Sequence, residues 1–512
     1  MTAQNFYITT PIYYANAAPH IGTLYTTLAG DIIARFKRRD GYNIKFITGA
    51  DEHGQKVEKA AKEANLAPQE FVDKMAGKFI TLFKEMHIVN DDFIRTTEQR
   101  HKKSAVALWD KLKENGHIYS GKYSGWYSLR DEAYFTEKEL VDGKAPTGAE
   151  VEWISEESYF FDLSKWQKKL LDLYKKNPEF VVPRWRLNEI VNIVEAGLPD
   201  LSISRTAFKW GIPIPNDPNH VMYVWLDALS SYLSVLGYPD IESKDFKTFW
   251  PADIHIMGKD ITKFHAIYWP AILMAAGLPL PKKIVSHGWW TVKGEKMSKS
   301  IRNVVDPFML IEKYGIDPVR YYLMREISFG EDGGFSEISL ISRANTELSN
   351  KIGNLLQRTL AFIYKNCDNR IPKFEGTDLK GLYSKTDVLQ EATGLLERVK
   401  KELDSFQFNQ MLEILVRFAD TLNVYVDQQA PWTLKKSDRK TMEQSLYITL
   451  ESFRYLAILL IPFMPESTEK MLDQMGIGKD LRTFKHLSMD FALKDSVISE
   501  PKAIFPKICK LL

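Results

Sequence analysis

The stretch from Asn5 to Gly54 constrains the fold most, because two strand patterns flank one helix pattern within it. An aromatic and β-branched run begins at Phe6 and breaks before Pro19, and apolar residues then recur at helical spacing from Ile21 to Phe36. A second apolar run, Ile44 to Ile47, ends in a polar turn. This order predicts a βαβ unit, in which ligands bind at the carboxyl ends of the strands, beside the helix N-terminus.

The rest of the chain extends this unit into a doubly wound α/β domain followed by helices. Residues 55–116 have mostly helical patterns. Strand-like apolar runs return at 221–227, 254–257 and 284–292, and an apolar helix pattern lies at 264–276. The predicted fold is a parallel sheet, Rossmann-like and split by an insertion, with a helical bundle after it. We divide it as 1–116 (first half of the α/β domain), 117–220 (connective insertion), 221–287 (second half), 288–341 (a Lys/Ser loop and its neighbours) and 342–512 (bundle, with helix patterns at 342–366, 385–405, 408–428, 440–461 and 464–474).

The composition is that of a large globular chain. The 512 residues exceed one ordinary domain, and 45% hydrophobic and 26% charged residues are ordinary values. The net charge of +2 neither requires nor excludes a nucleic-acid partner. The two cysteines, Cys367 and Cys509, imply no disulfide framework, and the most apolar stretch, 455–464, is too short to span a membrane. We therefore expect a cytoplasmic protein without a membrane segment.

The sequence His20-Ile21-Gly22-Thr23 opens the first predicted helix. An imidazole at a helix N-terminus can stabilise phosphate charge, and Gly22 would let a nucleotide approach the backbone closely. A plain helix cap, with Pro19 as the breaker, explains the same residues equally well. The motif alone therefore leaves nucleotide binding and capping open.

A second motif, Lys296-Met297-Ser298-Lys299-Ser300, follows the last strand-like run. Two lysines three residues apart, interleaved with hydroxyls, can wrap a triphosphate and neutralise the charge on a departing pyrophosphate. Alone, such a run is more often a solvated surface loop. Its combination with the first motif, about 270 residues earlier, is rare. Together the two motifs predict one nucleotide site.

These motifs resemble the signatures of the class I aminoacyl-tRNA synthetases, and segments from Tyr7 to about Pro465 narrow the resemblance to the methionyl-tRNA synthetase family. The resemblance implies a ligase that activates L-methionine with ATP, releases pyrophosphate and transfers the methionyl group to tRNA(Met). ATP would enter with Mg²⁺ as co-substrate. The family's catalytic positions match His20, Lys296 and Lys299, and its ATP site matches His20, Gly22, Thr23, Lys296, Met297, Ser298, Lys299 and Ser300.

The segments Trp225–Ala228 and Phe264–Pro270 are similar to the methionine-pocket segments of that family. Aromatic side chains could also surround a thioether for chemical reasons, since sulfur–aromatic contacts are favourable, and Asp51 could hold an α-ammonium group. Any one of these aromatics alone is more often a core residue. By the resemblance, Arg205 matches an arginine associated with substrate handling, and the pocket comprises Pro11, Ile12, Tyr14, Asp51, Trp225, Ala228, Leu229, Tyr232, Phe264 and His265.

The insertion lacks the zinc knuckles that many members of the family carry, because no cysteine precedes Cys367. The segment 125–132 resembles the metal-free form, in which Arg130, Asp131 and Glu132 are expected to supply ion pairs and hydrogen bonds in place of zinc. We therefore predict no structural zinc. The insertion is also short for a hydrolytic editing domain of the kind in the valine and isoleucine enzymes.

In the predicted bundle, Asn350, Asn354 and Arg358 recur every four residues and therefore share one helix face. Pro431 and Trp432 lie at the end of another helix. The resemblance implies that these positions read the CAU anticodon, with Trp432 stacking an unpaired base and the polar side chains bonding base edges. Without the resemblance, a solvated stripe and a capping tryptophan would be the better interpretation.

One residue departs from the family, since Thr23 stands where its members usually have a second histidine. Two alternatives therefore stay open. One is another class I synthetase, such as the leucine, valine or cysteine enzyme, although a zinc-bound thiolate selector would need the missing cysteines. The other is a catalytically idle paralogue that binds RNA or acts as a scaffold. We expect a monomer, because no dimerising module follows the bundle.

Overall fold

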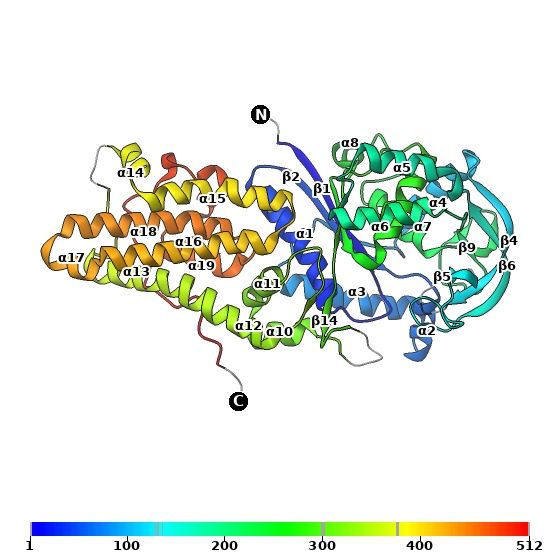
Figure 1. Cartoon of the computed structure of the whole chain (residues 1–512), viewed down its shortest axis with the longest axis horizontal. Coiled ribbons are helices and arrows are strands. Elements are labelled where there is room, and N and C mark those ends of the chain that lie inside the picture. The colour runs from blue at the N-terminus through cyan, green and yellow to red at the C-terminus, as the bar shows by residue number, and fades with distance from the viewer. Residues whose placement is uncertain are drawn as a thin grey trace.

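The molecule is elongated, with an α/β part at one end and a helical bundle at the other (Figure 1). This computed structural model describes residues 3–128, 130, 133–135, 137–297, 303–374 and 378–509. Helix α1 (Ile21–Arg39) lies between the two parts. None of the helices in the described ranges is both long and apolar enough to cross a membrane.

Six parallel strands form the central sheet, in the order β3-β2-β1-β12-β13-β7. Their bounds are Asn5–Tyr14 (β1), Asn43–Asp51 (β2), Asp92–Arg95 (β3), Val181–Val182 (β7), Ile254–Gly258 (β12) and Ile284–His287 (β13). The strand order reverses at β1, which pairs with β2 on one side and β12 on the other. Such a switch point opens the crevice where doubly wound folds bind ligands. The predicted α/β fold is confirmed.

Helices pack around this sheet. Besides α1, they are α2 (Gln55–Glu63), α3 (Pro68–Glu85), α4 (Gln99–Glu114), α7 (Val224–Ser234), α8 (Lys244–Phe249) and α9 (Trp269–Ala276). The predicted strand at 221–227 is wrong beyond Met222, because α7 begins at Val224. A short apolar run fits a strand and a buried helix equally well, so its spacing could not separate them.

The predicted insertion contains two small antiparallel sheets, with the orders β5-β4-β6-β8 and β10-β11-β9. Their strands are β4 (Ile118–Ser128), β5 (Ala133–Phe135), β6 (Glu152–Phe161), β8 (Leu201–Ser202), β9 (Ser204–Arg205), β10 (Pro213–Ile214) and β11 (Asp217–Met222). Helices α5 (Gln167–Lys176) and α6 (Arg184–Glu195) flank β7, which pairs with β13 of the central sheet. The segment 117–220 therefore also completes the sheet it interrupts, and its boundaries as a domain stay a prediction.

The predicted strand at 284–292 is interrupted at Gly288. β13 ends at His287, and β14 (Trp290–Val292) belongs to a separate small sheet with β15 (Glu295–Lys296) and β16 (Gly333–Gly334). A Cβ atom at position 288 would lie 2.2 Å from the backbone of Glu331. Only glycine allows this close approach, and the break leads the chain toward the second motif.

The bundle follows the sequence prediction closely. Four predicted helices are confirmed as α15 (Asp387–Asp404), α16 (Phe408–Gln429), α18 (Arg439–Leu460) and α19 (Pro465–Gln474). The predicted helix at 342–366 consists of the end of α12 (Glu337–Arg343), the π-helical η5 (Ala344–Gly353) and α13 (Asn354–Asn366). Shorter helices are α10 (Pro307–Tyr314), α11 (Ile316–Arg325), α14 (Leu379–Lys385) and α17 (Pro431–Ser437).

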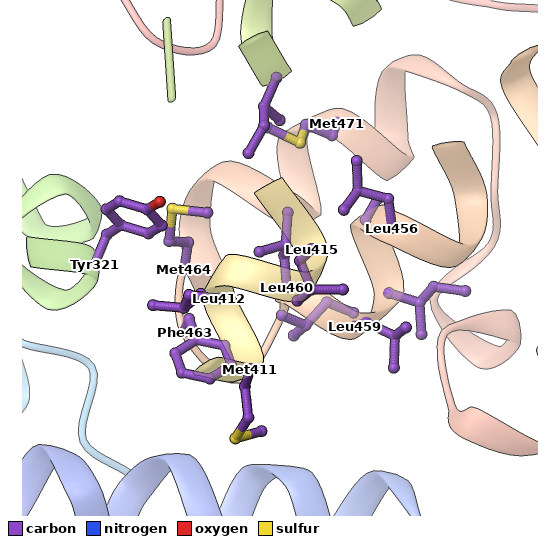
Figure 2. Packing of buried hydrophobic residues seen from close by; sticks show 14 of the residues in the cluster. Tyr321, Met411, Leu412, Leu415, Leu456, Leu459, Leu460, Phe463, Met464 and Met471 are labelled. Carbon is purple, nitrogen blue, oxygen red and sulfur yellow. The ribbon is translucent and has the colours of Figure 1, made fainter. Parts of the chain in front are cut away.

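One continuous apolar core joins α1 to the bundle. Figure 2 shows part of it, where Tyr321 of α11 lies beside Met464, and Phe463 lies beside Leu412 of α16. The two parts of the molecule are therefore packed together through a common core and are not merely connected by a flexible linker.

Arg320 of α11 places a fully buried guanidinium within this core. It donates to the carboxylate of Asp31 in α1 at 2.7 Å. It also donates to three backbone carbonyls at 2.8–2.9 Å, those of Met86, Pro462 and Phe463. Because a buried charge needs such partners, this contact fixes the bundle against α1.

Candidate active site

Parts of both motifs meet at the N-terminus of α1. His20 caps this helix, because its Nδ1 accepts a hydrogen bond from the backbone N–H of Gly22 at 3.0 Å. The N–H of Ile21 donates to the carbonyl of Val305, just beyond the second motif, at 3.3 Å. A Cβ atom at position 22 would lie 3.9 Å from Cε of Met297. The structure thus places Met297 beside the first motif.

The rest of the second motif is described only for the backbone of Lys296, which pairs with Thr291 of β14. Ser298, Lys299 and Ser300 lie outside the described residues, as does the side chain of Lys296. Thr23 of the first motif is buried, and its carbonyl accepts from the hydroxyl of Thr27 at 3.0 Å. The predicted catalytic roles of His20, Lys296 and Lys299 stay predictions.

The sequence prediction missed His287, at the end of β13. Its Nδ1 lies 2.7 Å from the carbonyl oxygen of Gly288 and therefore carries the proton, so that Nε2 accepts from the hydroxyl of Thr26 at 2.7 Å. Burial lowers the pKa of His287 to about 4, which keeps the ring neutral near pH 7. This contact ties the first turns of α1 to the strand that leads to the second motif. The available sequence signal was a histidine at the end of a short strand-like run, just before Gly288.

The predicted methionine-pocket residues come from four elements. They are Pro11, Ile12 and Tyr14 on β1, Asp51 at the end of β2, Trp225, Ala228, Leu229 and Tyr232 on α7, and Phe264 and His265 on the π-helical η4 (Phe264–Tyr268). Ile12, Ala228, Leu229 and Tyr232 belong to one apolar cluster, with Trp225 packed against it. π-Helical turns are rare and occur frequently at functional sites.

Two aromatic side chains form a partly exposed stack in this region. The rings of Trp225 and Phe264 lie 3.8 Å apart with an angle of 14° between their planes. The ring of His265 meets Trp225 edge-on at 6.0 Å. Because the two rings cover each other's facing surfaces, a polarizable thioether can contact the edges and outer faces of the stack.

Behind the stack, hydrogen bonds fix the tautomer of His265. Its Nδ1 donates to the carbonyl of Ile261 at 3.0 Å, so its Nε2 accepts from the hydroxyl of Tyr232 at 2.7 Å. Burial lowers the pKa of His265 to about 4 and raises the pKa of Tyr232 above its usual range. Tyr232 also stacks at 4.4 Å on His255 of β12, a buried histidine that the sequence prediction missed. The side chains of His265 and Tyr232 are therefore neutral and hydrogen-bonded to each other.

Asp51 places a buried carboxylate at the crevice. It pairs in register with Tyr14, and its carbonyl accepts from the N–H of Ala15 at 2.8 Å. Both residues therefore end their strands side by side at the switch point. Arg205, the predicted substrate-handling arginine, is buried and donates to the carbonyl of Ser204 at 2.6 Å, with its guanidinium 4.5 Å from the Tyr223 ring that precedes α7.

In the insertion, the exposed Arg130 donates to the carbonyl of Thr147. Asp131 and Glu132, which were predicted to act with it, lie outside the described residues. Among the residues that the structure describes, no three His, Cys, Asp or Glu side chains come together in a way that could hold a metal ion.

Four of the predicted anticodon residues lie on the bundle surface, whereas the fifth, Pro431, is buried at the start of α17. Asn350 and Asn354 are exposed and line a cavity of about 240 Å³. Arg358 donates to Asp427 of α16 at 3.0 Å, so its guanidinium is held against that helix. Trp432, in the first turn of α17, keeps 48% of its surface exposed. A tryptophan this exposed is available for stacking, and anticodon reading by these residues stays a prediction.

Comparison with known proteins gives two family matches. The family described as tRNA synthetases class I (M) matches residues 6–152 and 139–360, and the anticodon-binding domain of tRNA ligase matches residues 385–502. The methionine--tRNA ligase of Rickettsia conorii is 55% identical over 98% of this chain and 99% of its own. That of Brucella suis is 45% identical over 99% of this chain and 98% of its own.

A solved structure extends this similarity to the fold. The Mycobacterium tuberculosis methionyl-tRNA synthetase in complex with methionyl-adenylate superposes with a TM-score of 0.94 and 44% identity, covering 98% of this chain and all of that one. The chain therefore belongs to the methionine–tRNA ligases, a family of class I aminoacyl-tRNA synthetases.

Proposed function

We propose that the chain is a methionine–tRNA ligase, which activates L-methionine with ATP and transfers it to tRNA(Met). The observation that carries this proposal is the position of Met297 beside the His20-capped N-terminus of α1, at the crevice that Asp51 borders. Family membership and the methionyl-adenylate in the similar mycobacterial structure support the same activity.

In the proposed first step, a carboxylate oxygen of methionine attacks the α-phosphorus of ATP in line. The new O–P bond forms as the bond to the bridging oxygen breaks, and pyrophosphate leaves with the electron pair. No covalent enzyme intermediate is needed, because positioning and charge stabilisation lower the barrier. His20 and the N–H groups at the start of α1 would bind phosphate oxygens, while Lys296 and Lys299 would neutralise the departing pyrophosphate.

Methionine recognition uses the pocket residues. Asp51 would bind the α-ammonium group, and the Trp225–Phe264 stack would contact the sulfur. The neutral state of His265 matters here, because a cationic ring would repel the ammonium group. Tyr232 holds this ring through its hydroxyl and so keeps it in place.

The proposal includes magnesium as part of the ATP substrate and no structural zinc. Mg²⁺ would arrive bound to the phosphates of ATP as part of the co-substrate. The insertion would fold without zinc, since no cysteine precedes Cys367 and contacts such as Arg130 to Thr147 can take over the structural role. Metal analysis of the purified chain tests the second statement, and one zinc per chain would contradict it.

In the proposed second step, the methionyl group passes to the 2′-hydroxyl of the terminal adenosine of tRNA(Met). Trp432 would stack on an anticodon base, and Asn350, Asn354, Arg358 and Pro431 would complete the site. We also propose that the protein is a cytoplasmic monomer. Sedimentation of the purified chain and fractionation of the source cells test these two statements.

Exchange of labelled pyrophosphate into ATP tests the proposed function. Exchange should require methionine and should not occur with leucine, valine or cysteine. Lys299→Ala should slow exchange far more than it weakens methionine binding. Exchange driven by another amino acid would identify a different class I synthetase. A chain that binds RNA without any exchange would be the idle paralogue, for which Thr23 is the supporting residue.

A further inference from the structure

Asp227 joins two histidines from distant parts of the chain. Its Oδ2 lies 2.6 Å from Nδ1 of His53, and its Oδ1 lies 2.6 Å from Nε2 of His101. All three side chains are at most 4% exposed. An ionised carboxylate only accepts hydrogen bonds, so each histidine presents one N–H to one carboxylate oxygen. We call these three residues the aspartate clamp.

The carboxylate of Asp227 stays ionised inside the protein. Burial by itself raises the pKa of a carboxyl, but His53 and His101 hold the pKa of Asp227 well below its usual range. A buried charge of this kind is costly unless it is fully hydrogen-bonded, and here both oxygens have a partner. An apolar contact between α4, which carries His101, and α7, which carries Asp227, would avoid the free-energy cost of burying a charge. The buried charge therefore needs a further explanation.

The clamp connects the two walls of the predicted methionine pocket. His53 follows Asp51 by two residues, in the turn after β2. Asp227 follows Trp225 by two residues, in the first turn of α7. The clamp therefore fixes the position of the Asp51 carboxylate relative to the aromatic stack on the other wall.

Other contacts hold the turn after β2 from different sides. The indole N–H of Trp210 donates to the carbonyl of Glu52 at 2.5 Å, and the N–H of Gly54 donates back to the carbonyl of Trp210 at 2.9 Å. Arg95 of β3 donates to the carboxylate of Glu52 at 2.6 Å. These contacts tie the turn to β3 and to the segment before β10, whereas Asp227 ties it to α7.

We propose that Asp227 is a positioning residue for methionine, which sets the ammonium-binding carboxylate of Asp51 at the correct distance from the side-chain pocket. This inference rests on the proposed function and adds to it residues that do not themselves touch the substrate. In Asp227→Asn, one carboxylate oxygen becomes an amide N–H₂ that faces a histidine N–H, so one half of the clamp is lost. The turn that follows Asp51 is then free to shift away from α7.

Calorimetric titration of the full chain with two ligands tests this proposal without requiring catalysis. One ligand is methionine, and the other is 4-(methylthio)butanoate, which has the same side chain and carboxylate but no ammonium group. Asp227→Asn should weaken methionine binding about tenfold, the size of one charge-assisted hydrogen bond, and leave the ammonium-free ligand unchanged. In Asp51→Asn, adding Asp227→Asn should cause no further loss of methionine binding. Equal weakening of both ligands, additive losses, or unchanged methionine binding would each overturn the proposal.

Controls separate positioning from loss of stability. Asp317→Asn changes another buried carboxylate, which accepts from the N–H of Ser467 at 2.5 Å in the bundle, and should leave the binding of both ligands unchanged. His101→Gln keeps a donor toward Asp227, so it should weaken methionine binding less than Asp227→Asn does. If Asp227→Asn does not fold, His101→Gln is used in its place. If the wild-type chain binds methionine but catalyses no exchange, the proposed function fails while the binding test of the clamp still holds. If it binds no methionine, both fail.

Discussion

Replacing Arg320 with methionine should destabilise the whole chain by about 3–4 kcal/mol. The methionine fills similar space but leaves three backbone carbonyls without their donor, those of Met86, Pro462 and Phe463. Each lost hydrogen bond contributes about 1 kcal/mol, and a buried pair that loses one partner costs about 3–5 kcal/mol. The lower part of that range applies because Asp31 keeps a second cation, Arg35, at 2.8 Å.

Urea unfolding followed by tryptophan fluorescence measures this effect. With a slope of at least about 3 kcal/mol per molar urea for a chain of this size, the midpoint should fall by up to about 1 M. Arg320→Lys keeps the charge but not the planar fork, so it should lose about half as much.

A surface pair provides the matched control for this experiment. Arg417→Met breaks an exposed pair with Glu413 within α16, where such contacts contribute about 0–1 kcal/mol. The reasoning would be refuted if Arg320→Met shifted the midpoint no more than Arg417→Met does.

Three further changes test separate parts of the molecule. A Cβ atom in Gly22→Ala would lie 2.8 Å from the His20 ring, so the imidazole must move, and pyrophosphate exchange should fall by about 10²-fold with methionine binding intact by calorimetry. Burial lowers the pKa of His265 to about 4, below the value of about 6.5 in the unfolded chain, so stability should fall as the pH drops from about 6.5 to 4, by up to about 1.4 kcal/mol per pH unit. In His265→Gln, the free energy of unfolding measured with urea should depend less steeply on pH. An unchanged pH dependence would refute a neutral, buried His265. Trp432→Ala should lower tRNA charging by about 5- to 150-fold, the value of one stacked base, while exchange without tRNA stays unchanged; a parallel loss of exchange would contradict a role in RNA binding alone.

The bundle was predictable from sequence because long amphipathic patterns leave little choice. The pattern at 408–428 became α16 almost residue for residue. Short elements were not predictable in this way. The four residues of β3 fell inside a region predicted as helical, and the two residues of β7 carry too little pattern to be recognised as a strand.

In the active-site region, too, some residues could be predicted from the sequence and others could not. Residues within local motifs, such as His20 and Asp51, could be named because their chemistry is concentrated in a few neighbouring positions. Asp227 and its histidines could not, because His53 and His101 lie 174 and 126 residues away in the sequence. Only the folded chain brings their partners together, and a lone aspartate in an apolar run gives no indication of what it will bind.

The position of β1 in the sheet also affects how the protein is made. Its partner β2 follows within the same βαβ unit, but its other partner, β12, begins only at Ile254. At about 5–20 residues per second, the roughly 160 residues between β3 and β12 take about 8–30 s to synthesise. During that time the ribosome carries a half-sheet with an open edge along β1, the kind of surface that pairs with other chains. The nascent chain should therefore depend on chaperones until the strand from the second half arrives.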